Sequence, residues 1–213
     1  MSLPLKDWPT AEALDQSARE CEDRAGKERL VRKLAIRSLV ELMPPSGFAG
    51  MRSPAISPDN SHVLHSFSEG GRQQIYSTNL QAKDPTKLTD GAGIDNWPCF
   101  SPDGKQVVFG SSRDGSFEIY VMKSDGSGAR RLTHSPFQDI RPRFSPDGQR
   151  IAFVSHRDGN GEIYVINVDG TGLTRVTHHA GRDDYAEWHS DGERLVIVSE
   201  RNGQHDLYLI GVP

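Results

Sequence analysis

Residues Arg141–Thr177 read RPRFSPDGQRIAFVSHRDGNGEIYVINVDGTGLTRVT, and Trp97–Thr133, 44 positions earlier, read WPCFSPDGKQVVFGSSRDGSFEIYVMKSDGSGARRLT. The same interval separates the tyrosines of four related apolar runs, Tyr76, Tyr120, Tyr164 and Tyr208, and the turn aspartates Asp59, Asp103, Asp147 and Asp191. A period of about 40–45 residues with several short strands per unit is typical of the blades of a β-propeller. The sequence therefore predicts an all-β propeller with four blades over residues 51–213.

Four strands, named a to d in chain order, are predicted in each blade because apolar runs alternate with turn motifs such as SPDG, RDG and SDG. Strand a is expected at Ser53–Ile56, Trp97–Phe100, Arg141–Phe144 and Tyr185–Trp188. Strand b is expected at Ser61–Phe67, Gln106–Ser112, Arg150–His156 and Arg194–Glu200. Strand c is expected at Gln74–Asn79, Glu118–Lys123, Glu162–Asn167 and Asp206–Ile210, and strand d at Lys87–Thr89, Arg130–Thr133 and Thr174–Thr177.

The first 50 residues differ from the blades in composition. Glu, Arg, Lys, Ala and Leu dominate residues 10–43, and apolar residues recur there at helical spacing, which predicts a helical N-terminal segment followed by a Pro- and Gly-containing linker. Strand d of the fourth blade would fall beyond Pro213. Propellers commonly close with a strand from the other terminus. Residues 36–43 could therefore form either a helix or that closing strand.

Three architectures are compatible with four blades: a ring closed within one chain, an open half-ring, or an eight-bladed ring made by a homodimer. An open half would expose two apolar blade faces, whereas two copies would cover both faces by two-fold symmetry. The formal net charge of −4 gives no basic surface that would predict nucleic-acid binding. No apolar run approaches the roughly 18 residues of a membrane span. Without a signal peptide the sequence as written favours the cytoplasm, and a removed signal peptide would place the protein in the periplasm.

An ion pair across each b–c hairpin is predicted in blades 2 to 4. Arginine ends strand b at positions 113, 157 and 201, and an acid opens strand c at Glu118, Glu162 and Asp206. In blade 1 both members change, to Glu69 and Gln74. The paired change predicts that the two groups contact each other and set the register of the hairpin.

The repeat resembles the TolB-type, WD-like propeller repeat. The resemblance rests on FSPDG at Phe100–Gly104 and Phe144–Gly148, on the SSRDG and SHRDG segments that follow, on EIYV at Glu118–Val121 and Glu162–Val165, and on DG-x-G-x-x-R-x-T at the unit ends. It implies a β-propeller, but it implies no single activity, because similar repeats occur in binding proteins, in propeller domains of peptidases and in some lyases.

The channel mouth is the candidate binding site. Asp95, Asp139 and Asp183 recur three positions before the strand-a proline or its replacement Ala186. A ring of carboxylates could hold the basic end of a peptide or a cation such as calcium, and the alternative is that each aspartate caps its own loop. Beside them the large side chains of Trp97, Arg141 and Tyr185 differ between blades. Variation within a regular repeat is where specific recognition is expected, because positions that maintain the fold repeat.

Other chemistry has weaker support. Two cysteines, Cys21 and Cys99, have no spacing typical of a metal site or disulfide framework, and His134 and His178 recur in loops that start far from the channel axis. Neither G-x-S-x-G nor H-E-x-x-H occurs. The predicted function is therefore a non-enzymatic scaffold that binds a protein or peptide and needs no cofactor. The alternatives are a lyase or hydrolase with His, Arg and Asp in the channel, and a purely structural propeller fragment.

Overall fold

The structure is a computed structural model that describes residues 51–69, 71–80 and 84–213. The chain divides into two units, Met1–Pro44 and Pro45–Pro213, and every described residue belongs to the second. The predicted helical segment and the alternative closing strand at 36–43 therefore lie outside the described residues. The described part of the chain contains no helix that could cross a membrane.

Four antiparallel sheets make up the described unit: three are built from consecutive strands in the order a-b-c-d, and the fourth has strands a, b and c. Blade 1 contains β1 (Met51–Ile56), β2 (His62–Glu69), β3 (Arg72–Asn79) and β4 (Pro85–Lys87). Blade 2 contains β5 (Asp95–Phe100), β6 (Gln106–Ser111), β7 (Glu118–Lys123) and β8 (Arg130–Arg131). Blade 3 contains β9 (Asp139–Phe144), β10 (Arg150–Ser155), β11 (Glu162–Asn167) and β12 (Thr174–Arg175). Blade 4 contains β13 (Asp183–Trp188), β14 (Arg194–Ser199) and β15 (Asp206–Gly211).

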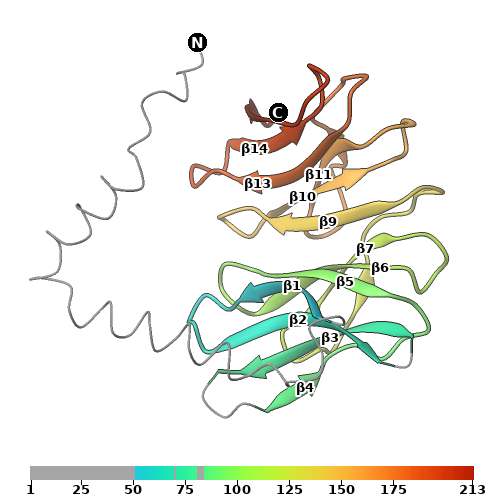
Figure 1. Cartoon of the computed structure of the whole chain (residues 1–213). Helices are drawn as coiled ribbons and strands as arrows, with labels where there is room; N and C mark the ends of the chain where they lie inside the picture. The colour runs from blue at the N-terminus through green and yellow to red at the C-terminus, as the bar shows by residue number, and fades with distance from the viewer. Residues whose placement is uncertain (1–50, 70, 81–83) are drawn as a thin grey trace, which may run out of the picture. The chain divides into compact units, whose positions relative to one another are not determined.

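The sheets follow one another from blade 1 at the bottom of Figure 1 to blade 4 at the top. Their a strands are neighbours, because β1 contacts β5, β5 contacts β9 and β9 contacts β13. Within the described residues, β1 and β13 do not contact each other. The four blades therefore form an open arc around one side of a channel.

The apolar core lies between the blades. One cluster joins blades 2 and 3 through residues such as Val121, Phe144 and Phe153, and related clusters join blades 1 and 2 and blades 3 and 4. This follows from the nearly continuous apolar runs of strands b and c, such as Ile151–Val154: successive side chains of a strand point to opposite faces, so each sheet has two apolar faces. Burying both faces requires a blade on each side, and this explains why one blade could not be stable alone.

The SPDG turns are stabilised by hydrogen bonds from their own side chains. In blade 2, Ser101 Oγ donates to Asp103 Oδ1 at 2.6 Å, and that oxygen accepts the backbone N–H of Lys105 at 3.0 Å. Gly104 follows with φ 70°. Asn60 takes the place of this glycine in blade 1 with φ 58°, a left-handed conformation that asparagine tolerates better than most residues.

In blades 2 and 3 strand d is shorter than the sequence predicted, and in blade 1 it lies at Pro85–Lys87 and not at the expected Lys87–Thr89. The expected strand Arg130–Thr133 ends at Arg131. Leu132 N–H still donates to the carbonyl of Ile119 at 2.7 Å, but the N–H of Ile119 donates to Thr133 Oγ1 at 2.9 Å. The threonine hydroxyl thus replaces a backbone carbonyl, which ends the ladder while keeping the strand attached.

The predicted ion pairs across the b–c hairpins are wrong. Arg113 pairs with Asp95 at 3.1 Å, and Glu118 pairs with Arg131 at 2.6 Å. The register explains the difference, because Ser111 lies opposite both Asp95 on β5 and Glu118 on β7. Arg113 Nε donates to Ser111 Oγ at 2.8 Å, which turns the guanidinium toward β5.

In blade 3 the arginine and the glutamate have the same kinds of partner as in blade 2. In blade 4 the arginine does. Arg157 pairs with Asp139, Glu162 with Arg175, and Arg201 with Asp183, at 2.7, 3.1 and 3.1 Å. Each of these arginines links strand b to strand a or strand c to strand d within one blade. The pairs therefore fix the arrangement of strands across a blade and not the register of a hairpin.

Candidate functional site

A backbone irregularity places the candidate binding residues. Each a strand has a register shift in its pairing with strand b, at Arg52/Ala55 in β1 and at the equivalent positions of the other three. The bulged residue has a left-handed backbone in every blade: Ser53, Trp97, Arg141 and Tyr185 have φ of 54°, 54°, 57° and 49°. Non-glycine residues held in this region cost of order 1–3 kcal/mol each and cluster at functional sites.

Two of these bulges are stabilised by the side chain that precedes them. Asn96 Oδ1 accepts the backbone N–H of Trp97 at 2.9 Å, and Asp184 Oδ1 accepts that of Tyr185 at 2.8 Å. Asn96 also accepts the hydroxyl of Ser53 from the preceding blade at 3.0 Å. Asn96 therefore holds the left-handed residue of its own blade, Trp97, and contacts the left-handed residue of the preceding blade, Ser53.

The side chains of Trp97, Arg141 and Tyr185, called here the channel platform, lie next to one another. Arg141 Cζ lies 4.1 Å from the ring centroid of Tyr185 and 6.0 Å from that of Trp97. Its guanidinium donates to the Tyr185 hydroxyl at 3.2 Å and forms an ion pair with Asp184. The platform thus presents two aromatic rings on either side of a planar cation, with Tyr185 58% exposed.

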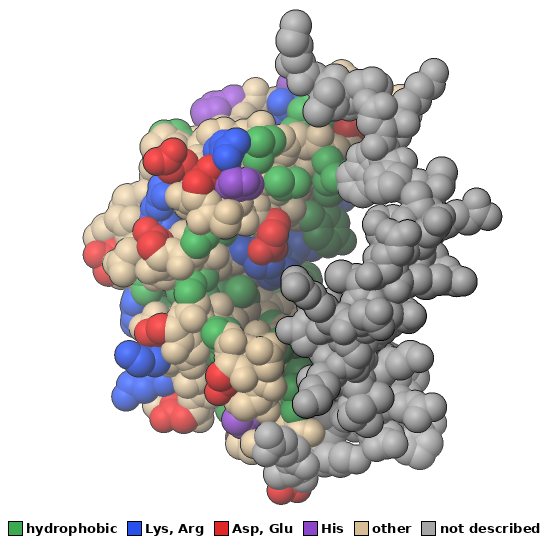
Figure 2. Space-filling model, turned by 90° about the vertical axis from the view of Figure 1, so that its left-hand side faces the viewer, with side chains coloured by type: hydrophobic (Ala, Val, Ile, Leu, Met, Phe, Trp, Pro, Cys, Tyr) green, Lys and Arg blue, Asp and Glu red, His purple; other side chains and the backbone are tan. Residues whose placement is uncertain are grey.

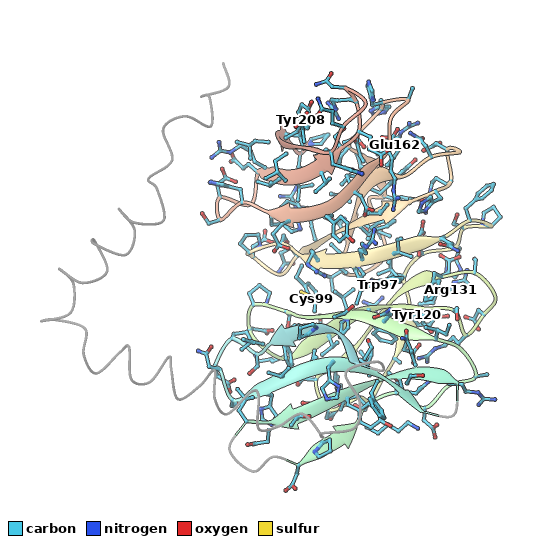
Figure 3. The ribbon with its side chains drawn as sticks, viewed as in Figure 1. Trp97, Cys99, Tyr120, Arg131, Glu162 and Tyr208 are labelled. Atoms are coloured by element: carbon cyan, nitrogen blue, oxygen red, sulfur yellow. The ribbon has the colours of Figure 1, made fainter. Side chains whose placement is uncertain are left out.

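An open hollow of about 480 Å³ is lined by the platform together with other residues of β1, β5, β9 and β13. Trp97 and Cys99 both lie on β5 in the middle of the described fold (Figure 3). Burial raises the pKa of the Cys99 thiol, so it stays protonated near neutral pH. Arg143, which also lines the hollow, pairs with the exposed Glu187 at 3.1 Å. The hollow therefore combines aromatic and apolar surface with charges that are already balanced.

Gly110 on β6 makes room for the platform. A Cβ at this position would lie 2.9 Å from Cε3 of the Trp97 ring. The equivalent residues of the other blades are Ser66, Val154 and Val198. Blade 2 thus combines the largest bulge side chain with the smallest residue on the adjoining strand. The ring also packs on Phe117, with centroids 5.2 Å apart.

The three aspartates predicted at the channel mouth are placed differently from the platform. Asp95, Asp139 and Asp183 are all buried, and each accepts an arginine of its own blade, as described above. Burial raises the pKa of Asp139. These carboxylates therefore support the start of each a strand. Of the six predicted residues, the structure brings Trp97, Arg141 and Tyr185 together.

Some residues that line the hollow or hold its side chains were missed by the sequence reasoning. Asp184 follows the predicted Asp183 and is the residue that binds Arg141 and also Arg182, the latter at 2.6 Å. Arg143 and Glu187 occupy equivalent positions two residues after the bulge. The available signal was that these positions also vary between blades, as the platform positions do.

A larger hollow of about 720 Å³ lies between the turns of blades 1 and 2. Its acidic residues include Asp59, Asp103 and Asp125, whose pKa values are lowered mainly by hydrogen bonds from serines of their own turns. Those oxygens are committed to the turns, so we do not assign this hollow a binding role. Within the described part of the chain, no three His, Cys, Asp or Glu residues converge to hold a metal.

The exposed charges form no single-sign surface on the face shown in Figure 2. Acidic and basic side chains are interspersed on the face shown in Figure 2, and hydrophobic side chains gather toward its middle. Such a surface provides little long-range attraction for a highly charged partner. Recognition is therefore expected to depend on close contacts in the hollow.

Four consecutive antiparallel blades, three with strands in the order a-b-c-d and one with strands a, b and c, whose a strands lie next to one another, define a β-propeller. The model of the TolB β-propeller domain matches residues 34–141, and that of the N-terminal β-propeller domain of the tricorn protease matches residues 125–210. The chain belongs to the TolB β-propeller family. No curated protein sequence matches it.

Solved structures give the same fold. The putative TolB of Agrobacterium tumefaciens is 30% identical with a TM-score of 0.71, and the match covers 78% of this chain and 64% of that one. TolB of Acinetobacter baumannii is 28% identical with a TM-score of 0.69, covering 76% and 41%. A puromycin-hydrolysing peptidase of Mycobacterium tuberculosis, 20% identical with a TM-score of 0.61, covers 78% and 28% and shows the fold alone. The chain thus spans less than two thirds of the length of its TolB relatives.

Proposed function

We propose that this chain is a non-enzymatic propeller scaffold that binds a protein or peptide in the hollow of its channel. The observation that supports the proposal is the channel platform, in which three bulged residues with left-handed backbone gather unlike side chains. Every blade has the bulge, but the side chain at the bulged position differs from blade to blade. Aromatic and arginine side chains are also the types enriched where binding energy concentrates.

The chemistry of the hollow favours an uncharged or weakly charged segment. Arg141 and Arg143 are already paired with Asp184 and Glu187, so an acidic ligand would have to displace a carboxylate. The rings of Trp97 and Tyr185 offer flat surfaces for aromatic, proline or aliphatic side chains. We therefore expect a peptide with an apolar anchor that packs against the platform.

The alternative of a lyase or hydrolase has less support. It requires His, Arg and Asp groups that are free to act on a substrate. In the described part of the chain no histidine lines the hollow, and its two arginines are held by carboxylates. Binding is the function that this arrangement supports better.

Selection of peptides from a random display library against the full chain tests the proposal. Trp97→Ala and Tyr185→Ala are expected to weaken the selected peptides at least about tenfold, which is about 1.4 kcal/mol. The matched control is Phe137→Ala, because Phe137 is half-exposed and aromatic but does not line the hollow. Equal binding by all three variants and the parent would refute the channel site.

We also propose that two copies join, as the repeat count suggested. Leu207 and Leu209 on β15 are 73% and 54% exposed, and the a strands of blades 1 and 4 do not meet within the described residues. A second copy would cover the apolar face that an open arc exposes. Light scattering on the full chain tests this proposal, with a mass of twice 23.6 kDa expected.

A further inference from the structure

The dipeptide Asn-Gly occurs twice in the sequence, at Asn160–Gly161 and at Asn202–Gly203. Both occurrences lie in b–c turns, the first between β10 and β11 of blade 3 and the second between β14 and β15 of blade 4. Asparagine is a chemically labile residue, and a following glycine has no side chain to keep its backbone nitrogen away from the asparagine amide. The chain therefore contains two candidate sites of spontaneous deamidation.

The first of the two amides is held in place. Asn160 is half-buried, and the Gly161 that follows it is buried. The Gly161 carbonyl accepts the backbone N–H of Asp183 at 2.8 Å, which ties the turn to blade 4. The Nδ2 atom of Asn160 lies 2.7–3.3 Å from four oxygens, the carbonyls of His179, Ala180 and Gly181 and Oε1 of Glu162. Rotation of this amide toward the Gly161 nitrogen would break several of these contacts at once.

The second amide has fewer restraints. Asn202 and Gly203 are both exposed. The Asn202 Nδ2 donates to the hydroxyl of Tyr208, which Figure 3 labels on blade 4, at 2.8 Å. The Gly203 N–H donates to the carbonyl of Glu200 at 2.9 Å, and this bond must open before the nitrogen can react. Both bonds lie in a turn at the surface, where local opening costs less free energy than in a buried segment.

We infer that Asn202 is a modification site, at which the folded chain converts asparagine to aspartate or isoaspartate with water as the co-reactant. The Gly203 backbone nitrogen attacks Cγ of Asn202 and forms a new C–N bond. The bond from Cγ to Nδ2 breaks, and ammonia leaves with the proton that the Gly203 nitrogen gives up. Water then opens the cyclic imide at either of its two carbonyl groups. The inference does not depend on the proposed function.

The aspartate product has a counterpart in the preceding blades. Asn202 occupies the repeat position of Asp158, which accepts the hydroxyl of Tyr164, and blade 2 has the same arrangement. Conversion would give Tyr208 the same kind of acceptor. Arg201 Cζ lies 4.6 Å from the ring centroid of Tyr208, so a cation lies close to the new carboxylate. The modified turn reads RDG, as in blades 2 and 3, and adds one negative charge to the net charge of −4.

Incubation of the full chain at mildly alkaline pH, followed by pepsin digestion in acid and mass spectrometry of the peptides, tests the inference. Alkaline pH accelerates the reaction because it favours removal of the proton from the attacking nitrogen, and acid prevents further conversion during digestion. Asn160 is the internal control, since it precedes glycine in the same chain. Asn202→Gln keeps the amide but moves it one carbon away, and Asn202→Asp supplies a chromatographic standard for the product. A parallel incubation in urea removes the contacts of both sites.

In the folded chain, Asn202 is expected to gain about 1 Da at an initial rate at least about five times that of Asn160, because its restraints open more easily. In urea the two rates should agree within about twofold, because unfolding removes the contacts that protect Asn160. Asn202→Gln should abolish the gain at position 202 and leave the rate at Asn160 unchanged.

Three results would overturn the inference. A smaller ratio in the folded chain would mean that the contacts of Asn160 do not protect it more than the turn protects Asn202. A folded chain that stays unmodified at Asn202 while the unfolded chain reacts there would mean that the bond between Gly203 and Glu200 blocks the reaction. The same large ratio in urea would mean that the flanking sequence and not the fold selects Asn202.

Discussion

The guanidinium of Arg141 lies 4.1 Å from the ring centroid of Tyr185, a residue one full repeat further along the chain. The two positions are equivalent in sequence and share the left-handed bulge, with φ of 57° and 49°. Asp184 connects them, since it pairs with Arg141 and accepts the N–H of Tyr185. Neighbouring blades are thus joined at the channel by side chains that do not repeat.

Arg141→Lys is expected to weaken peptide binding with little effect on the fold. A lysine keeps the charge next to Asp184, but an ammonium cannot stack on the Tyr185 ring or donate in the same plane. We expect the affinity for selected peptides to fall roughly tenfold, about 1.4 kcal/mol, by isothermal titration calorimetry. Arg72→Lys, at an exposed position outside the hollow, is the control and should leave the affinity unchanged. Unchanged binding by Arg141→Lys would argue against a role for the stacked cation.

Gly110 does not line the hollow, but Gly110→Val is expected to displace the Trp97 side chain and so to weaken peptide binding. The added Cβ would approach the indole to 2.9 Å, and overpacking of this kind costs typically about 1–3 kcal/mol. Urea unfolding measures the loss of stability. In a Trp97→Ala background the clash is absent, so the same substitution should cost much less. An equal cost in both backgrounds would show that the close contact is not the cause.

Asp139→Ala is expected to destabilise the fold by about 3 kcal/mol, because it leaves the Arg157 guanidinium without its buried partner. Chemical denaturation measures the change. The control is Lys105→Ala, which removes a pair with Asp103 that is 3.7 Å long and well exposed. Exposed pairs contribute about 0–1 kcal/mol, so this variant should differ little from the parent. Similar effects for both variants would contradict a structural role for the buried aspartate.

The free energy of unfolding is expected to fall at acid pH because the turn aspartates become protonated. Hydrogen bonds, first of all from Ser57, lower the pKa of Asp59 to about 2, and bonds led by the N–H of Glu193 lower that of Asp191 to about 2, both from 3.8. Because the folded-state values lie below the ordinary ones, the carboxylates contribute stability above pH 3.8 that is lost as pH falls toward 2. Carboxyl resonances followed by NMR measure each pKa directly. Ser57→Ala should raise the pKa of Asp59 and leave that of Asp191 unchanged, and equal shifts would refute the local cause.

Much of the fold was predictable because equivalent positions of the four repeats can be compared within the one sequence. The bounds of β7 and β11 agree with the prediction, since Glu118 and Glu162 each follow a turn motif and precede a continuous apolar run. The a strands begin two residues earlier than expected, at residues such as Asp95 and Asp139, because the bulge lies inside the strand. A repeated sequence marks the position of such a bulge, but it does not show the sign of φ.

The candidate site was predictable only in part. Variation between blades singled out Trp97, Arg141 and Tyr185, and the structure places these three side chains next to one another. Asp95, Asp139 and Asp183 were predicted to lie at the channel mouth because they recur at the repeat interval of 44 residues. That recurrence instead reflects a pair within each blade, such as Asp95 with Arg113, whose members are 18 positions apart and become neighbours only when β5 and β6 align.

The sequence by itself determined the number of repeats, the order of strands and the turns, because these depend on local periodicity and on residues a few positions apart. Tertiary structure alone decided which charges pair and which side chains share the hollow. It also decided that β1 and β13 stay apart while Leu207 and Leu209 are uncovered. The physical reason is that ion pairing depends on distances between strands of one blade, and burial depends on distances between blades. Residues such as Arg141 and Tyr185 meet only after separate sheets have packed.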